Sequence, residues 1–102
     1  MAMNACAHQD FIAAGAAQAA ALQALQQGLA TADRRRLLRA QQTHTAYAAA
    51  QCDFESGAVA GGSAQPMVKW QCMARLTQSR AEALRAAAQC TEGDLSCVRP
   101  QR

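Results

Sequence analysis

The chain is poor in aromatic residues and in proline, and it lacks long apolar runs. Only 4% of its 102 residues are aromatic, and it contains two prolines. About half of the residues count as hydrophobic, but 27 are alanine, which favours helices and buries little area per residue. No run approaches the roughly 20 apolar residues of a membrane-spanning helix. We therefore expect a single domain over residues 1–102, with a small core that needs staples or a partner.

Patterns typical of catalysis and of metal binding are also missing. The five cysteines form no C-x-x-C pair of the kind that structural zinc sites use. Neither His8 nor His44 has a second histidine at helical spacing, or a nucleophile and an orienting acid nearby in the sequence. The glycines between Gly57 and Pro66 follow a predicted helix, not the strand that a phosphate-binding loop requires. The sequence predicts a non-enzyme with no catalytic residue, no metal and no cofactor.

The net charge of +3 is mild, and one dense charge cluster contributes most of it. Arg34, Arg35, Arg36 and Arg39 lie at the predicted start of a helix, where positive charge opposes the helix dipole. Such a run can contact phosphates, and a nucleic-acid binder with steep salt dependence is one hypothesis. A solvated helix face is the commoner outcome, so we expect no nucleic-acid partner.

Three helices are predicted, over about 4–29, 32–55 and 64–90, with a short tail over 91–102. Asn4 is the expected N-cap of the first helix, and Ser63 is the expected cap of the third, with Pro66 in its first turn. Apolar and small residues at alternating spacings of three and four define each inward face. These faces comprise Phe11, Gly15, Gln18, Leu22, Leu25 and Leu29; then Leu37, Leu38, Gln41, Thr45, Ala48 and Cys52; then Trp70, Met73, Leu76 or Thr77, Arg80, Leu84 and Ala87. Since the connections are short, the predicted fold is all-α, an up-down-up antiparallel bundle.

This topology sorts the cysteines between the two ends of the bundle. Cys52 and Cys72 fall at one end, together with Cys6, and Cys90 and Cys97 fall near the other. We predict disulfides between Cys52 and Cys72 and between Cys90 and Cys97. Cys6 then has a partner in a removed upstream segment, forms an intermolecular bond, or stays a free thiol. Disulfides indicate the periplasm or the outside of the cell, and we expect that a signal peptide has been removed.

Two side chains on the third inward face are unusual for a small core. Trp70 is expected to pack in the core, although tryptophan is also common at partner interfaces. Arg80 is expected to reach solvent or to meet an acid, with Asp53, Glu55 and Glu82 as the candidates.

The segment between Cys52 and Cys72 is the predicted binding site. A disulfide at the tip of a helix hairpin would limit the conformations of the loop over 57–66 and lower the ordering cost of binding through it. A plain interhelical connection is the alternative. The candidate target-binding residues are Glu55, Ser56, Gly57, Val59, Gly61, Gly62, Ser63, Gln65 and Met67.

Several stretches resemble the LprI-type lysozyme inhibitor family. They are residues 51–55 (Gln-Cys-Asp-Phe-Glu), 61–67 (Gly-Gly-Ser-Ala-Gln-Pro-Met) and 72–80, which begins Cys-Met-Ala-Arg-Leu-Thr. Residues 3–7 and 38–41 are similar to the family's opening and middle helix, so the resemblance spans about 3–88. The residues before Cys52 and the tail with Cys90 and Cys97 depart from the family pattern. The resemblance implies a bacterial envelope domain that inhibits lysozyme.

These observations lead to hypotheses from different classes. The leading one is a periplasmic inhibitor of a peptidoglycan-degrading hydrolase that inserts the 57–66 loop into the target cleft. The target is a lysozyme, or a secreted peptidoglycan amidase against which the chain acts as a type VI immunity protein. A net positive charge disfavours a strongly basic lysozyme. The alternative is a structural envelope module that assembles as a homodimer or larger oligomer and has no hydrolase target.

Overall fold

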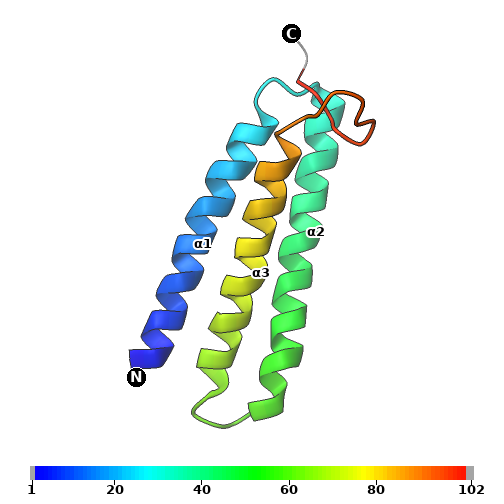
Figure 1. Cartoon of the computed structure of the whole chain (residues 1–102). Coiled ribbons are helices and arrows are strands. Elements are labelled where there is room, and N and C mark those ends of the chain that lie inside the picture. Colours follow the sequence, from blue (N-terminus) through cyan, green and yellow to red (C-terminus); the bar gives the residue numbers. More distant parts are fainter. Residues whose placement is uncertain (1, 101–102) are drawn as a thin grey trace.

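A computed structural model describes residues 2–100, and within that range the chain is helical with no strand. Helices α1 (Ala2–Gln26), α2 (Thr31–Ser56) and α3 (Gln65–Ala87) run up, down and up along a rod of 52 × 22 × 22 Å (Figure 1). A short 3-10 helix, η1 (Gly57–Val59), opens the connection between α2 and α3. The predicted all-α antiparallel bundle is confirmed. None of the described helices is both long and apolar enough to cross a membrane.

The first helix differs slightly from the predicted 4–29. It begins at Ala2, so Asn4, the expected N-cap, lies in the first turn. It ends at Gln26, because Gly28 takes a left-handed conformation with φ of 77° that reverses the chain before Leu29.

The third helix is shorter at both ends than the predicted 64–90. Its N-cap is Ala64, and no side chain caps it, so the expected capping role of Ser63 is wrong. Pro66 lies in the first turn as predicted. The helix ends at Ala87, three residues before Cys90.

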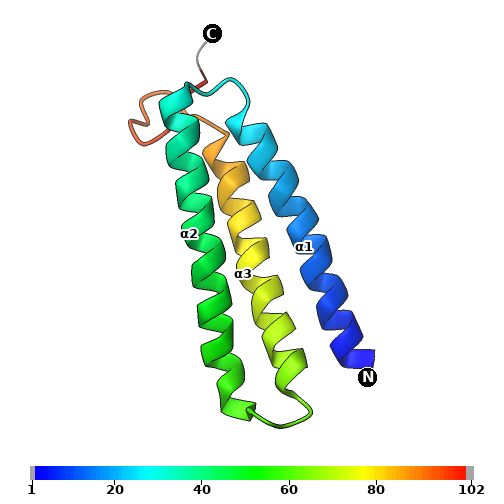
Figure 2. The same ribbon diagram turned by 180° about the vertical axis from the view of Figure 1, so that it is seen from behind.

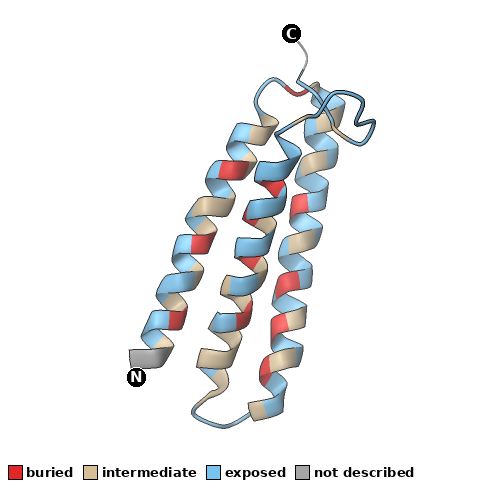
Figure 3. Ribbon diagram, in the orientation of Figure 1, coloured by how far each residue is buried: buried red, intermediate tan, exposed pale blue. Residues whose placement is uncertain are grey.

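Helix α3 lies between the other two helices, as the view from behind also shows (Figure 2). It contacts both α1 and α2, whereas α1 and α2 hardly touch each other. The contact with α1 is the more extensive, since α1 turns alanines at a seven-residue spacing toward the interior. Ala7, Ala14 and Ala21 are all buried, and they form the regular buried positions along α1 in Figure 3. The small side chains on this face of α1 allow α3 to approach closely.

The predicted inward face of α1 lies beside the buried alanines Ala7, Ala14 and Ala21 and does not include them. Of its six residues only Leu29 is buried, and the other five are half-buried. Gly15 is not a point of close approach between helices, because a Cβ added there would meet no atom within 4 Å. The buried positions of this helix are occupied by alanines.

The contact between α2 and α3 includes a polar pair. Nε of the half-buried Arg80 donates a hydrogen bond of 2.9 Å to Oε1 of the buried Gln41, so the side-chain partner of Arg80 is an amide and not an acid. Ala48 and Cys52 are buried as predicted, whereas Thr45 is exposed. Leu38 and Ala87 of the predicted inward faces are also exposed, and the half-buried members of these two faces are Leu37, Trp70, Met73, Leu76 and Arg80.

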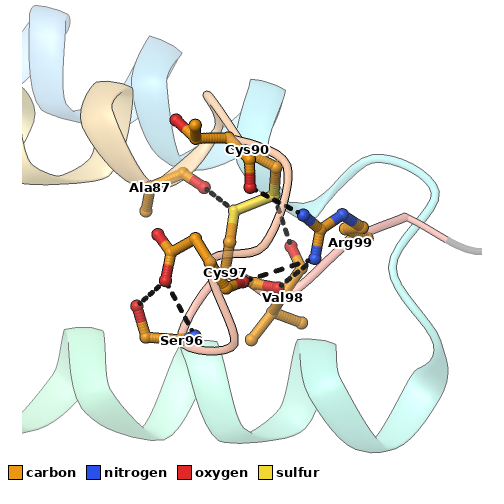
Figure 4. The surroundings of a disulfide bond; sticks show 8 residues. Ala87, Cys90, Ser96, Cys97, Val98 and Arg99 are labelled. Atoms are coloured by element: carbon orange, nitrogen blue, oxygen red, sulfur yellow. Dashed lines mark hydrogen bonds between the residues drawn. A yellow bond between two sulfur atoms is a disulfide. The ribbon is translucent and has the colours of Figure 1, made fainter.

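After α3 the chain folds back across the end of the bundle, where a second disulfide closes a small loop (Figure 4). Cys90 and Cys97 are joined as predicted, with 5.5 Å between their Cα atoms. The carboxylate of Asp94 accepts hydrogen bonds from the backbone and the hydroxyl of Ser96, at 2.9 and 2.6 Å. Arg99 donates to the carbonyl oxygen of Thr91 at 3.0 Å. The tail loop is therefore held by the Cys90–Cys97 disulfide and by hydrogen bonds that Ser96 and Arg99 donate.

Candidate functional site

A disulfide joins the end of α2 to the start of α3 at the tip of the rod. Cys52 and Cys72 are bonded as predicted, with 5.5 Å between their Cα atoms, and both are buried, at 0% and 1% exposure. The connection over 57–64 extends beyond this bond and forms the extreme end of the molecule (Figure 1). We call residues 53–67 the stapled end. Its disulfide fixes the separation of the two helices from which the loop emerges.

The loop itself is a series of hydrogen-bonded turns. The N–H groups of Ala60 and Gly62 donate to the carbonyl oxygens of Gly57 and Val59, at 3.1 and 3.0 Å. Gly61 has a φ of 79°, which favours glycine, and its N–H donates to the side-chain oxygen of Gln65 at 3.1 Å. Because internal bonds define its shape, the loop has little conformational entropy left to lose on binding.

The predicted target-binding residues differ in how far they reach solvent. Gly57, Gly61, Gly62 and Ser63 are exposed and form a slender tip of small residues. The residues that are only half-buried are Glu55, Val59, Gln65 and Met67. Ser56 is 1% exposed, and its hydroxyl lies 3.4 Å from the carbonyl oxygen of Asp53, so its side chain does not reach a partner in this conformation.

Charged side chains reinforce the base of the loop. Arg75 donates to both carboxylate oxygens of Glu55, at 2.8 and 3.0 Å, and Gln51 donates to one of them at 3.0 Å. The hydrogen bond from Gln51 and then those from Arg75 hold the pKa of Glu55 below its ordinary value. Lys69 lies 3.4 Å from the carboxylate of Asp53. Two ion pairs thus connect α2 and α3 beside the disulfide.

Sequence reasoning missed the most exposed aromatic ring of the stapled end. The side chain of Phe54, near the end of α2, is 77% exposed. The exposure of Phe54 could have been predicted from the sequence. Successive helical residues are about 100° apart, so a residue two positions after the inward-facing Cys52 must point away from the core. Exposed aromatic rings next to a rigid loop are typical anchors of protein interfaces.

Trp70 packs between helices, as predicted. Its ring stacks on that of Phe11, with 5.2 Å between centroids, and meets the edge of His8 at 4.6 Å. These contacts tie α3 to α1 just above the loop. The nearby Cys6 is exposed and unbonded.

The two histidines lie on different helices, His8 on α1 beside Trp70 and His44 on α2. His44 lies half-buried on α2, and burial, followed by the neighbouring charge of Arg80, lowers its pKa. Within residues 2–100, no three side chains from His, Cys, Asp and Glu lie close enough together to hold a metal ion.

The net charge of the described residues differs between the two ends of the rod. Near the stapled end lie the acids Asp10, Asp53 and Glu55 and the cations Lys69 and Arg75. The opposite end has the cations Arg34, Arg35, Arg36, Arg39, Arg85 and Arg99 and the acids Asp33, Glu92 and Asp94. The positive net charge therefore belongs to the end remote from the loop.

These features define a disulfide-stapled helical domain whose interhelical loop is held by internal hydrogen bonds. Residues 1–84 match the family described as lysozyme inhibitor LprI, so the chain belongs to that family. No curated protein and no solved structure matches it.

Proposed function

We propose that this chain inhibits a lysozyme-class peptidoglycan hydrolase by placing the 57–66 loop in the substrate cleft of the enzyme. The observation that carries the proposal is the combination of a stapled, internally hydrogen-bonded loop with membership in a family of lysozyme inhibitors. A slender tip of glycines and serine suits a narrow polysaccharide-binding cleft, and Phe54 beside it supplies an apolar anchor. Inhibition by occupation of a cleft needs no catalytic residue in the inhibitor.

The distribution of charge removes an objection to a basic target. A net charge of +3 would repel a basic lysozyme if it were spread evenly over the surface. The rod is 52 Å long, whereas charges in physiological salt are screened over roughly 8 Å. The arginines of the far end therefore have little influence at the loop, where Lys69 and Arg75 pair with Asp53 and Glu55 and the additional acid Asp10 leaves the described groups slightly negative.

Two disulfides favour the periplasm or the outside of the cell as the working compartment, since thiols in the cytosol are kept reduced. This is also where peptidoglycan and its hydrolases meet.

A matched pair of variants tests the proposal. Ser63→Trp places a large ring on the exposed loop tip at a position without left-handed φ, and Ser79→Trp makes the same change on an exposed turn of α3. In an assay of peptidoglycan hydrolysis by lysozyme, we expect Ser63→Trp to weaken inhibition about tenfold or more, since a loop that no longer fits loses at least 1.4 kcal/mol of binding. Ser79→Trp is expected to inhibit like the wild type.

Equal inhibition by the two variants would place the contact outside the loop. The same assay with a peptidoglycan amidase distinguishes the immunity hypothesis, because an immunity protein would inhibit the amidase and leave lysozyme active. If the wild type inhibits neither enzyme, the inhibitor proposal is wrong.

A further inference from the structure

The end of the rod opposite the loop contains an apolar cavity. Its volume is about 660 Å³, within the range of about 300–1,000 Å³ that small-molecule sites occupy. All three helices and the tail contribute to its wall. The apolar lining includes Leu25, Leu29, Leu37, Ala83, Ala86 and Val98.

The roof of the cavity lies outside the part of the chain that matches the family. The family match ends at residue 84, whereas the roof comes from residues 94–98 of the tail loop. The Cys90–Cys97 disulfide and the hydrogen bonds of Asp94 and Arg99 hold this loop in place (Figure 4). The cavity is therefore completed by residues outside the matched segment, and the loop at the other end of the rod does not contribute to it.

Both carboxylates in the cavity wall already have partners. Asp33 forms an ion pair with Arg36. Asp94 accepts two hydrogen bonds from Ser96, which lower its pKa, and the charge of Arg99 lowers it further. Neither acid is left to attract a cationic ligand.

Positive charge at the mouth of the cavity is only partly compensated. The side chain of Arg36 lines the wall and is 72% exposed, so part of its guanidinium stays open to a ligand. Arg34 donates to the carbonyl oxygen of Leu29 at 3.1 Å, and neither Arg35 nor Arg39 pairs with a carboxylate of the described residues. These arginines lie in the first turns of α2, where the helix dipole opposes them. A bound anion would relieve that repulsion.

We infer that this cavity binds a single-chain anionic amphiphile, with its apolar chain among Leu25, Leu29 and Leu37 and its acidic head group at Arg36. The apolar wall provides the driving force for the chain, and the exposed guanidinium selects the head group. A neutral molecule of the same length would gain only the first contribution. The site is distinct from the proposed hydrolase contact and does not depend on it.

Titration of the full-length protein with dodecanoate below its micellar concentration, followed by calorimetry, tests this inference. Dodecanol is the uncharged control and should bind more weakly. Ala86→Trp fills the cavity from an exposed position, and we expect it to weaken dodecanoate binding about tenfold or more. Ala49→Trp, on an exposed part of α2 outside the lining of this cavity, is the matched control and should bind dodecanoate like the wild type.

A second pair of variants isolates the head-group contact. Arg36→Gln is expected to weaken dodecanoate binding about three- to fivefold, the range of an exposed ion pair. Arg35→Gln removes the same charge one residue away, outside the wall, and should have a smaller effect. The inference is overturned if dodecanoate does not bind, if Ala86→Trp binds like the wild type, or if dodecanol binds equally well. It is also overturned if sedimentation shows that a second copy of the chain occupies the cavity.

Discussion

The two ends of the rod are both closed by a disulfide, but the two bonds act on different parts of the structure. At the stapled end, Cys52–Cys72 spans 20 residues and cross-links two long helices through buried sulfurs. At the opposite end, Cys90–Cys97 spans seven residues within the tail and cross-links no pair of helices. The first bond fixes the base of the exposed loop at the tip of the rod. The second bond fixes the tail loop that covers the cavity. One small domain thus has two stapled surfaces, of which only the first lies within the family match.

Removal of each disulfide gives the largest expected contrast between the ends. In the chain-entropy model, Cys52→Ala with Cys72→Ala should lower the free energy of unfolding by about 3 kcal/mol, and loss of buried sulfur adds to this. Cys90→Ala with Cys97→Ala should cost less, about 2.4 kcal/mol in the same model, because the closed span is shorter. Urea denaturation followed by circular dichroism measures both. A larger loss for the second pair would contradict the assignment of the helix cross-link to the stapled end.

Charge reversal at each end sharpens the electrostatic comparison. Asp53→Lys should slow association with a basic lysozyme about three- to tenfold, since the side chain is 68% exposed at the proposed contact. Arg35→Glu makes the opposite change at the far end and should alter the rate less than twofold, because salt screens it over the length of the rod. Stopped-flow binding at physiological salt compares the two. Equal and opposite effects would mean that the whole-molecule charge steers association.

A substitution midway along α1 should stabilise the bundle without affecting either end. Gly15→Ala is expected to raise the free energy of unfolding by about 0.5–1 kcal/mol, since alanine favours the helix and the added Cβ meets no atom within 4 Å. Chemical denaturation measures this gain. Hydrolase inhibition and dodecanoate binding should remain unchanged, which would separate global stability from the two surfaces. A destabilised variant would show that the α1–α3 seam is tighter at this point than the structure indicates.

Acid should weaken each end through the protonation of one carboxylate, Glu55 or Asp94, with small effects because neither group is fully buried. The folded pKa values of Glu55 and Asp94 lie below their ordinary values of 4.5 and 3.8. Their contribution to stability is therefore present above those values and is lost as the pH falls through the folded pKa. Gln51→Ala should raise the pKa of Glu55 alone, and Ser96→Ala that of Asp94 alone. Carboxyl titration by NMR measures both, and a coupled shift would show that the two ends are not independent.

Much of the fold was predictable because its signals are local. Helix-forming segments separated by glycines predict three helices, and short connections predict their directions. The positions of Cys52, Cys72, Cys90 and Cys97 in that topology then determine both disulfides.

The details that were not predicted depend on contacts between distant segments. In a chain with 27 alanines, nothing local distinguishes Ala7, Ala14 and Ala21 from their exposed neighbours, so the seam of α1 was assigned to larger residues. Arg80 finds its partner in Gln41, 39 positions away, and no spacing rule indicates that pair. The cavity depends on the tail folding back over the bundle, for which the sequence carries no periodic signal. Phe54, by contrast, could have been recognised from its helical phase relative to Cys52.

Hydrogen–deuterium exchange of this protein alone and in complex with lysozyme tests the central claim most directly. The account predicts slower exchange on binding in residues 53–67 and unchanged exchange in the Cys90–Cys97 loop. Protection confined to the tail loop and the first turns of α2, with none at the stapled end, would contradict it.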